Sequence, residues 1–152
     1  MSNDSYPRDI PPLWLLVSIG AMFALHVTVP LAIWVFDPWR YLGYVVITLG
    51  VLLVLGNAMR FKRAGTGIRP FSEATTVVRE GAFRWTRNPM YLGMVTVAFG
   101  VAIRLGSASP MAVPAMLFFV LDRRFVRLEE SFLRHSMGKA YDDYCADVRR
   151  WL

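Results

Sequence analysis

Long apolar runs constrain the fold of this chain more than any other feature of its sequence. Residues 13–36 contain no ionisable side chain other than His26, and residues 41–59 contain no Asp, Glu, Lys or Arg. A helix rises about 1.5 Å per residue, so about 20 residues cross a hydrocarbon core about 30 Å thick. Both runs therefore predict membrane-spanning helices, and Pro30 predicts a kink within the first.

Two further apolar runs, residues 90–105 and 110–124, follow a polar middle segment. The last run continues into a charged stretch, and apolar residues recur through it at spacings of three and four: Phe118, Leu121, Phe125, Leu128 and Phe132. This period is typical of an amphipathic helix with its charged residues on the other sides. We therefore expect an all-α integral membrane protein, one domain over residues 1–152, with four transmembrane helices and a helical arm over residues 125–152.

Two local features predict how the first two runs pack. The four residues Asp37–Arg40 are too few for anything but a tight turn, which predicts an antiparallel helical hairpin. Gly43 and Gly50 are seven residues apart and lie on nearly the same face of the second run. Because glycine has no side chain, we expect another helix to come close there.

The distribution of positive charge predicts the orientation in the membrane. The chain has 17 Lys and Arg residues and a net charge of +6, and 15 of the 17 lie at position 8, within residues 60–88, or from residue 123 onward. Cytoplasmic segments are enriched in Lys and Arg, so both termini and the middle segment are expected on the cytoplasmic side. Because the basic residues interrupt apolar runs that no DNA-binding domain carries, we expect membrane lipid, and not nucleic acid, as the partner of this charge.

Cysteine and histidine limit the chemistry further. Cys145 is the only cysteine, which excludes an intramolecular disulfide. His135 has no Cys or His partner at the spacing of metal ligands, so no metal site is expected. His26 is more often a hydrogen-bonding residue between helices than a ligand, although an ionisable group at this depth is also a candidate site. Residues 1–12 lack the basic start of a signal peptide, so we expect the first run to remain in the mature protein.

The third apolar run begins with an unusual group of side chains, Arg87-Asn88-Pro89-Met90-Tyr91-Leu92-Gly93. Asn at the N-cap and Pro at the first position start a helix well, and an interfacial Tyr and Arg anchor it to lipid, so a structural role accounts for the motif. Glu129-Glu130 has a similar explanation as a solvated face paired with neighbouring arginines. Together, however, the two stretches converge on one membrane face, where they are able to enclose a polar or charged ligand.

Several motifs in one order suggest a family. The run Arg84-Trp85-Thr86-Arg87-Asn88-Pro89-Met90-Tyr91-Leu92-Gly93 is followed by Glu129-Glu130, then by Gly138-Lys139-Ala140-Tyr141-Asp142-Asp143-Tyr144 and Val148-Arg149-Arg150-Trp151. From about residue 62 to residue 152 the chain resembles the integral-membrane methyltransferases of the isoprenylcysteine carboxyl methyltransferase and phospholipid methyltransferase group. The resemblance implies S-adenosylmethionine as cofactor, held between an Arg-His-Pro-x-Tyr type motif and a downstream Glu-Glu pair, and a lipophilic acceptor that enters from the bilayer.

The resemblance also implies site residues. Carried over by position, the cofactor-binding residues are Arg87, Asn88, Tyr91, Gly93, Glu129 and Glu130. Arg87, to hold a carboxylate, and Glu130, as base for an acceptor that needs one, are the candidate catalytic residues. Gly65-Thr66-Gly67 is similar to a Gly-x-Gly of phospholipid methyltransferases. Asn88 departs from the histidine of the prenylcysteine enzymes, so a prenylcysteine substrate is not implied.

The chemistry of these residues suits such a cofactor. A carboxylate accepts from the ribose or amino group, an aromatic face suits the sulfonium, and Arg suits a carboxylate. We expect Tyr141, Tyr144 and Trp151 to pack against the membrane face as a lid. The predicted function is methyl transfer to a lipophilic small molecule or lipid at the cytoplasmic face of a bacterial inner membrane. Two alternatives remain: a non-catalytic scaffold or subunit that binds anionic lipid, and a reductase that binds a nicotinamide cofactor.

Overall fold

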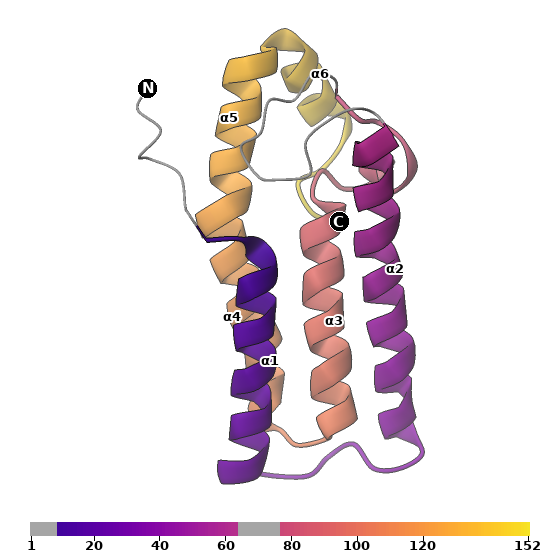
Figure 1. The fold of residues 1–152 in the computed structure, drawn as a ribbon, viewed down its shortest axis with the longest axis vertical. Coiled ribbons are helices and arrows are strands. Elements are labelled where there is room, and N and C mark those ends of the chain that lie inside the picture. The colour runs from indigo at the N-terminus through magenta and orange to yellow at the C-terminus, as the bar shows by residue number, and fades with distance from the viewer. Residues whose placement is uncertain (1–8, 64–76) are drawn as a thin grey trace.

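The computed structural model describes residues 9–63 and 77–152, and these residues form helices with short connections (Figure 1). The α-helices in the described residues are α1 (Pro11–Thr28), α2 (Leu42–Arg63), α3 (Pro89–Leu105), α4 (Ala112–Leu121), α5 (Arg127–Met137) and α6 (Lys139–Asp147). Figure 1 shows α1 to α4 as a bundle, with α5 and α6 beyond one end of it. The predicted all-α class is confirmed.

Glycines bring α2 and α3 into backbone contact. A Cβ atom added at Gly43 would lie 2.6 Å from the carbonyl oxygen of Gly100, and one added at Gly50 would lie 2.8 Å from that of Gly93. The relation is reciprocal, since a Cβ atom at Gly93 would lie 2.9 Å from the carbonyl oxygen of Gly50. The close approach predicted from Gly43 and Gly50 is confirmed, and its partner is α3.

The first helix is shorter than the predicted span 13–36, because α1 ends at Thr28. Pro30 therefore ends the helix and does not kink it: proline disfavours a helical conformation at the residue before it and lacks the N–H that a helix needs. The chain after it lies along the turn that follows α3, where the N–H groups of Trp34 and Val35 donate to the carbonyl oxygen of Gly106 at 3.0 and 3.2 Å.

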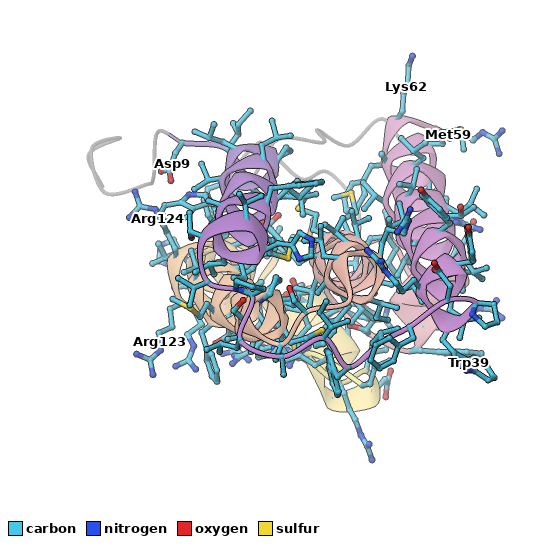
Figure 2. All side chains as sticks on the ribbon, turned by 90° about the horizontal axis from the view of Figure 1, so that it is seen from below. Asp9, Trp39, Met59, Lys62, Arg123 and Arg124 are labelled. Carbon is cyan, nitrogen blue, oxygen red and sulfur yellow. The ribbon has the colours of Figure 1, made fainter. Side chains whose placement is uncertain are left out.

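The prediction of a tight hairpin between the first two spans was wrong. The connection runs from Val29 to Tyr41, and α1 packs against α3 and α4, with α2 on the other side of α3 (Figure 2). At the far end of α1, Arg124 donates two hydrogen bonds of 2.9 Å to the carboxylate of Asp9. The start of α1 is thereby tied to the long helix that begins with α4.

The apolar surfaces fit an integral membrane protein. Within the described residues, α1 and the segment Trp39–Arg63 are long and apolar enough to cross a membrane, and α3 is a shorter apolar helix. Leu16, Val27 and Leu52 are 65%, 78% and 61% exposed. Large apolar surfaces of this kind are unfavourable in contact with water and favourable in contact with lipid.

A π-helical turn at Asp122–Val126 joins α4 to α5 and changes which face is buried. Residues in a π-helix bond five positions apart, so each advances less around the axis, and the buried face shifts by about one position. Leu121 and Phe125 are fully buried as predicted, but Leu128 is 36% exposed and Glu130 is 3% exposed. The expectation that the apolar period continues through Leu128, with Glu130 on a solvated side, was therefore wrong.

We expect Gly50→Ala to destabilise the protein and Gly20→Ala to leave it nearly unchanged. The added methyl group at Gly50 meets backbone, and such overpacking costs about 1–3 kcal/mol, or a Tm lower by roughly 2–12 °C. A methyl group at Gly20 meets no atom within 4 Å. Melting curves in detergent measure both, and equal Tm values for the two variants would contradict the backbone contact.

Candidate functional site

A pocket lies where α5 and α6 cover the start of α3. Its empty volume is about 610 Å3, including space open to solvent. The lining is mostly apolar and aromatic: Phe61, Val77, Val78, Phe83, Arg87, Asn88, Pro89, Met90, Tyr91, Glu129, Glu130, Leu133, Met137, Tyr141 and Tyr144. The list includes five of the six predicted cofactor-binding residues, so the two motifs meet as expected.

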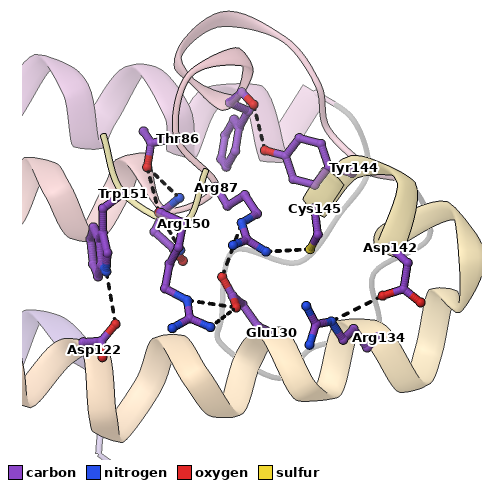
Figure 3. Close-up of polar contacts among 12 residues, drawn as sticks. Thr86, Arg87, Asp122, Glu130, Arg134, Asp142, Tyr144, Cys145, Arg150 and Trp151 are labelled. Atoms are coloured by element: carbon purple, nitrogen blue, oxygen red, sulfur yellow. Dashed lines mark hydrogen bonds and ion pairs between the residues drawn. The ribbon is translucent and has the colours of Figure 1, made fainter. Parts of the chain in front are cut away.

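Glu130 is the buried charge of this pocket (Figure 3). Its Oε2 atom accepts two hydrogen bonds from Arg150, from Nε at 3.0 Å and Nη2 at 2.7 Å. Its Oε1 atom lies 3.6 Å from Nε of Arg87, too far for a good hydrogen bond. Both of these atoms are buried, and neither has a hydrogen-bond partner in the described part of the chain. The two side chains thus form a buried ion pair in which the Oε1 acceptor and the Nε donor are each left without a hydrogen bond.

Glu129 faces the same pocket with a different partner. The hydroxyl group of Tyr91 donates to Oε2 of Glu129 at 2.8 Å, and the Tyr91 ring stacks against Phe125 with centroids 6.4 Å apart. Burial raises the pKa of the Glu129 carboxyl, the charge of Glu130 raises it further, and the Tyr91 hydrogen bond opposes the shift. The two neighbouring carboxylates therefore differ: Glu130 is held by arginines and Glu129 by a neutral hydroxyl.

Asn88 and Pro89 start α3, as predicted, but the Asn88 side chain does not cap the helix. Its Nδ2 atom donates to the carbonyl oxygen of Arg150 at 3.1 Å. The explanation of Asn88 as a capping residue is therefore wrong for its side chain. Its amide instead forms a hydrogen bond between the start of α3 and the segment 148–152, which are far apart in the sequence.

In the segment 148–152, the sequence predicted a role only for Trp151, as part of a lid, and did not predict that Arg150 or the backbone of the segment belongs to the site. Its Arg149 and Arg150 carbonyl oxygens accept from the Arg87 N–H at 2.9 Å and the Thr86 hydroxyl at 3.0 Å. Its Arg150 side chain reaches Glu130. For Arg150, the only signal in the sequence was the Val-Arg-Arg-Trp run within the resemblance, and nothing in that run distinguishes Arg150 from Arg149.

Two of the three residues of the predicted aromatic lid line the pocket, and their role as a lid stays a prediction. Tyr141 and Tyr144 are 3% exposed and line the pocket, and the Tyr144 hydroxyl donates to the carbonyl oxygen of Phe83 at 2.7 Å. Burial raises the pKa of Tyr144 to about 12. Trp151 contacts the end of α4, outside the pocket lining, with its ring centroid 4.7 Å from that of Phe118.

Three other predicted features lie elsewhere. Gly93 does not line the pocket and is packed against Gly50, so its role in cofactor binding stays a prediction that the geometry does not favour. Gly65-Thr66-Gly67 lies outside the described residues. His26 bonds Ser107 at 2.7 Å, which confirms a hydrogen-bonding role between segments. Among residues 9–63 and 77–152, no group of His, Cys, Asp and Glu could hold a metal ion.

Comparison with known proteins agrees with the convergence of these motifs. The model of the phospholipid methyltransferase family matches residues 39–140, about two thirds of the chain. The chain belongs to this family. It is therefore an S-adenosylmethionine-dependent membrane methyltransferase.

Two curated relatives carry the name probable protein-S-isoprenylcysteine O-methyltransferase, one from Oryza sativa subsp. indica and one from Oryza sativa subsp. japonica. Each is 25% identical to this methyltransferase over 160 residues, which covers 95% of the chain and 82% of the relative. No solved structure gives a significant match.

We expect Glu129→Gln to raise Tm by an amount that grows with pH. Because the pKa of Glu129 is raised above its ordinary 4.5 in the folded protein, the folded state keeps this proton where the unfolded chain has lost it. The contribution of Glu129 to the free energy of unfolding therefore falls as the pH rises from 4.5 to the raised pKa. Above that pKa this contribution is constant. Gln avoids this cost and still accepts from Tyr91.

Melting curves of both proteins between pH 4.5 and neutrality measure the difference. A difference in Tm that is the same at every pH would contradict the raised pKa of Glu129.

Proposed function

We propose that this methyltransferase binds S-adenosylmethionine in the pocket between α3, α5 and α6 and methylates a lipophilic small molecule or lipid. The observation that carries the proposal is the buried ion pair of Arg87 and Glu130, in which Nε of Arg87 and Oε1 of Glu130 each lack a hydrogen-bond partner. A buried polar group without a partner costs about 1–3 kcal/mol. A ligand that offers both an acceptor and a donor removes this cost at both atoms.

The aminoacyl end of the cofactor has this pair of groups. Its carboxylate accepts from the Arg87 Nε–H, and its ammonium group, or a ribose hydroxyl, donates to Oε1 of Glu130. Asn88 lies in the lining beside them, while its side chain holds the 148–152 segment. The apolar and aromatic remainder of the lining suits the adenine.

The bound cofactor supplies a methyl group activated by a sulfonium. The protein supplies position and the exclusion of water, which account for a large part of such an acceleration. Tyr91 is held by its hydrogen bond to Glu129 and by stacking on Phe125, so its ring and hydroxyl have one orientation. An oriented aromatic ring near the pocket is suited to a cation.

The geometry favours Glu129 over Glu130 as general base for an acceptor that must lose a proton. Glu130 forms ion pairs with Arg150 and Arg87, so its negative charge is balanced by these arginines and is less available to accept a proton. The pKa of Glu129 is raised by burial, which brings the carboxyl closer to the working pH that suits a base. A carboxylate acceptor needs no base, so this role applies to an amine acceptor.

We propose four membrane-spanning segments in a single domain, with the pocket and both termini at the cytoplasmic face of a bacterial inner membrane. The positive charge supports this orientation, since Arg87, Arg134, Lys139 and Arg150 all lie at the pocket end of the bundle. The exposed apolar faces of α1 and α2 support a bilayer setting, from which a lipophilic acceptor reaches the pocket.

Isothermal titration with S-adenosylhomocysteine tests the pocket. We expect the wild type to bind, and Glu130→Gln to weaken the affinity by about tenfold or more, because a hydrogen bond to a charged group contributes about 1.5–3 kcal/mol. Glu80→Gln, a matched change on an exposed residue outside the lining, is expected to bind normally. No binding to the wild type at millimolar ligand would overturn the proposal.

Labelling of single cysteines tests the orientation. In a Cys145→Ser background, Asp37→Cys lies in the exposed connection before α2 and Lys139→Cys at the exposed start of α6. A membrane-impermeant maleimide is expected to label Asp37→Cys in intact spheroplasts and Lys139→Cys only after lysis. The reverse pattern would place the pocket on the outer face.

A further inference from the structure

The segment 148–152 is held in place at two points. The first is the start of α3, where Thr86, Arg87 and Asn88 donate three hydrogen bonds of 2.9–3.1 Å to the carbonyl oxygens of Arg149 and Arg150. One donor is the backbone N–H of Arg87, and the other two are the Thr86 hydroxyl and the Asn88 side-chain amide. The backbone of the segment is thus fixed beside Arg87.

The second point is the π-helical turn. Nε1 of Trp151 donates to Oδ1 of Asp122 at 3.1 Å, and Asp122 is 6% exposed and also accepts from Nε of Arg127 at 2.7 Å. The Trp151 ring packs on Phe118. The segment therefore connects the start of α3 to the helix that carries Glu130, with Arg150 between the two anchors.

Arg150 determines how the Glu130 carboxylate is turned. Both of its hydrogen bonds go to Oε2, which leaves Oε1 without a hydrogen bond, in an ion pair of 3.6 Å with Nε of Arg87 (Figure 3). Arg and carboxylate groups readily form two parallel hydrogen bonds. Without Arg150, the Glu130 carboxylate is free to rotate and form hydrogen bonds with Arg87. These bonds would occupy the two atoms that otherwise remain available to a ligand.

We propose that Arg150 is a positioning residue for cofactor binding: by holding Oε2 of Glu130, it keeps Oε1 of Glu130 and Nε of Arg87 in an ion pair too long for a hydrogen bond, so that both atoms stay available to hydrogen-bond the ligand. The inference rests on the proposed function, in which these two atoms contact the cofactor. Pre-organisation of this kind lowers the cost of binding, because the ligand does not have to break a hydrogen bond between Arg87 and Glu130 first.

A purely structural role for Arg150 predicts a different result. Its side chain is 35% exposed, but its partner Glu130 is buried, so the loss of Arg150 leaves that charge less well compensated and is expected to lower Tm. A structural role predicts only this loss of stability, whereas a positioning role predicts a strong loss of ligand affinity in Arg150→Gln protein that is still folded. Arg149 is the matched control, since it has the same charge, is adjacent and exposed, and contributes only its backbone to the site.

The experiment measures the affinity for S-adenosylhomocysteine by titration, KM for S-adenosylmethionine, kcat and Tm. Arg150→Gln is expected to weaken binding and raise KM by about tenfold or more, the effect of losing a charged hydrogen bond, with a smaller change in kcat. Arg150→Lys is expected to have an intermediate affinity, because an ammonium group holds Oε2 but lacks the two fixed donors of the planar guanidinium. Arg149→Gln is expected to match the wild type.

A double-mutant cycle makes the test decisive. If Arg150 acts through Glu130, Arg150→Gln has no further effect on affinity in a Glu130→Gln background. Equal effects in both backgrounds, or wild-type affinity of Arg150→Gln, would overturn the inference. Should Arg150→Gln fail to fold, Arg150→Lys in both backgrounds gives the same comparison. Loss of affinity in Glu130→Gln together with no effect of Arg150 would reject only this inference, whereas a wild type that does not bind would reject the proposed function itself.

Discussion

The carboxylate of Glu130 is buried, and a buried charge is tolerated only when opposite charges surround it. Its partners, Arg87 and Arg150, come from the start of α3 and from the 148–152 segment, so one charge connects three parts of the chain that are far apart in sequence. The remaining contacts of the site follow from this arrangement. The 148–152 segment has to lie along residues 86–88 for Arg150 to reach Glu130, and α5 has to turn the same carboxylate toward α3. The pocket is the space that these constraints leave between the helices.

Much of the helical core could be predicted because it depends on local composition. Apolar runs of sufficient length predicted α1 to α4, and Pro89 predicted the start of α3 to the residue. Gly43 and Gly50 predicted a close contact, although not that α3 would provide it. The end of α1 was missed because a proline within an apolar run is compatible with both a kink and a stop. The choice depends on whether the following chain finds other partners, and here it finds them at Gly106.

The meeting of Arg87 and Tyr91 with Glu129 and Glu130 was also predictable, because charge distribution and motif order both place them at one end of the bundle. Arg150 was not, because 17 basic residues look alike until the backbone beside them is known, and the direction of a side chain in an extended segment alternates from one residue to the next. Gly93 illustrates a different limit. A glycine in a motif suits both close helix packing and close approach of a ligand, and only the position of α2 distinguishes the two.

The π-helical turn has a consequence for how related chains are compared. Such a turn has one residue more than the α-helical turn that it replaces, so its gain or loss corresponds to a single-codon insertion or deletion. A relative lacking that residue would bring a neighbour of Glu130 to the same place in space without any substitution at the acidic pair. Alignments of such chains therefore need to allow a one-residue gap between Asp122 and Val126, and the number of positions after α4 does not identify which acidic residue is equivalent to Glu130.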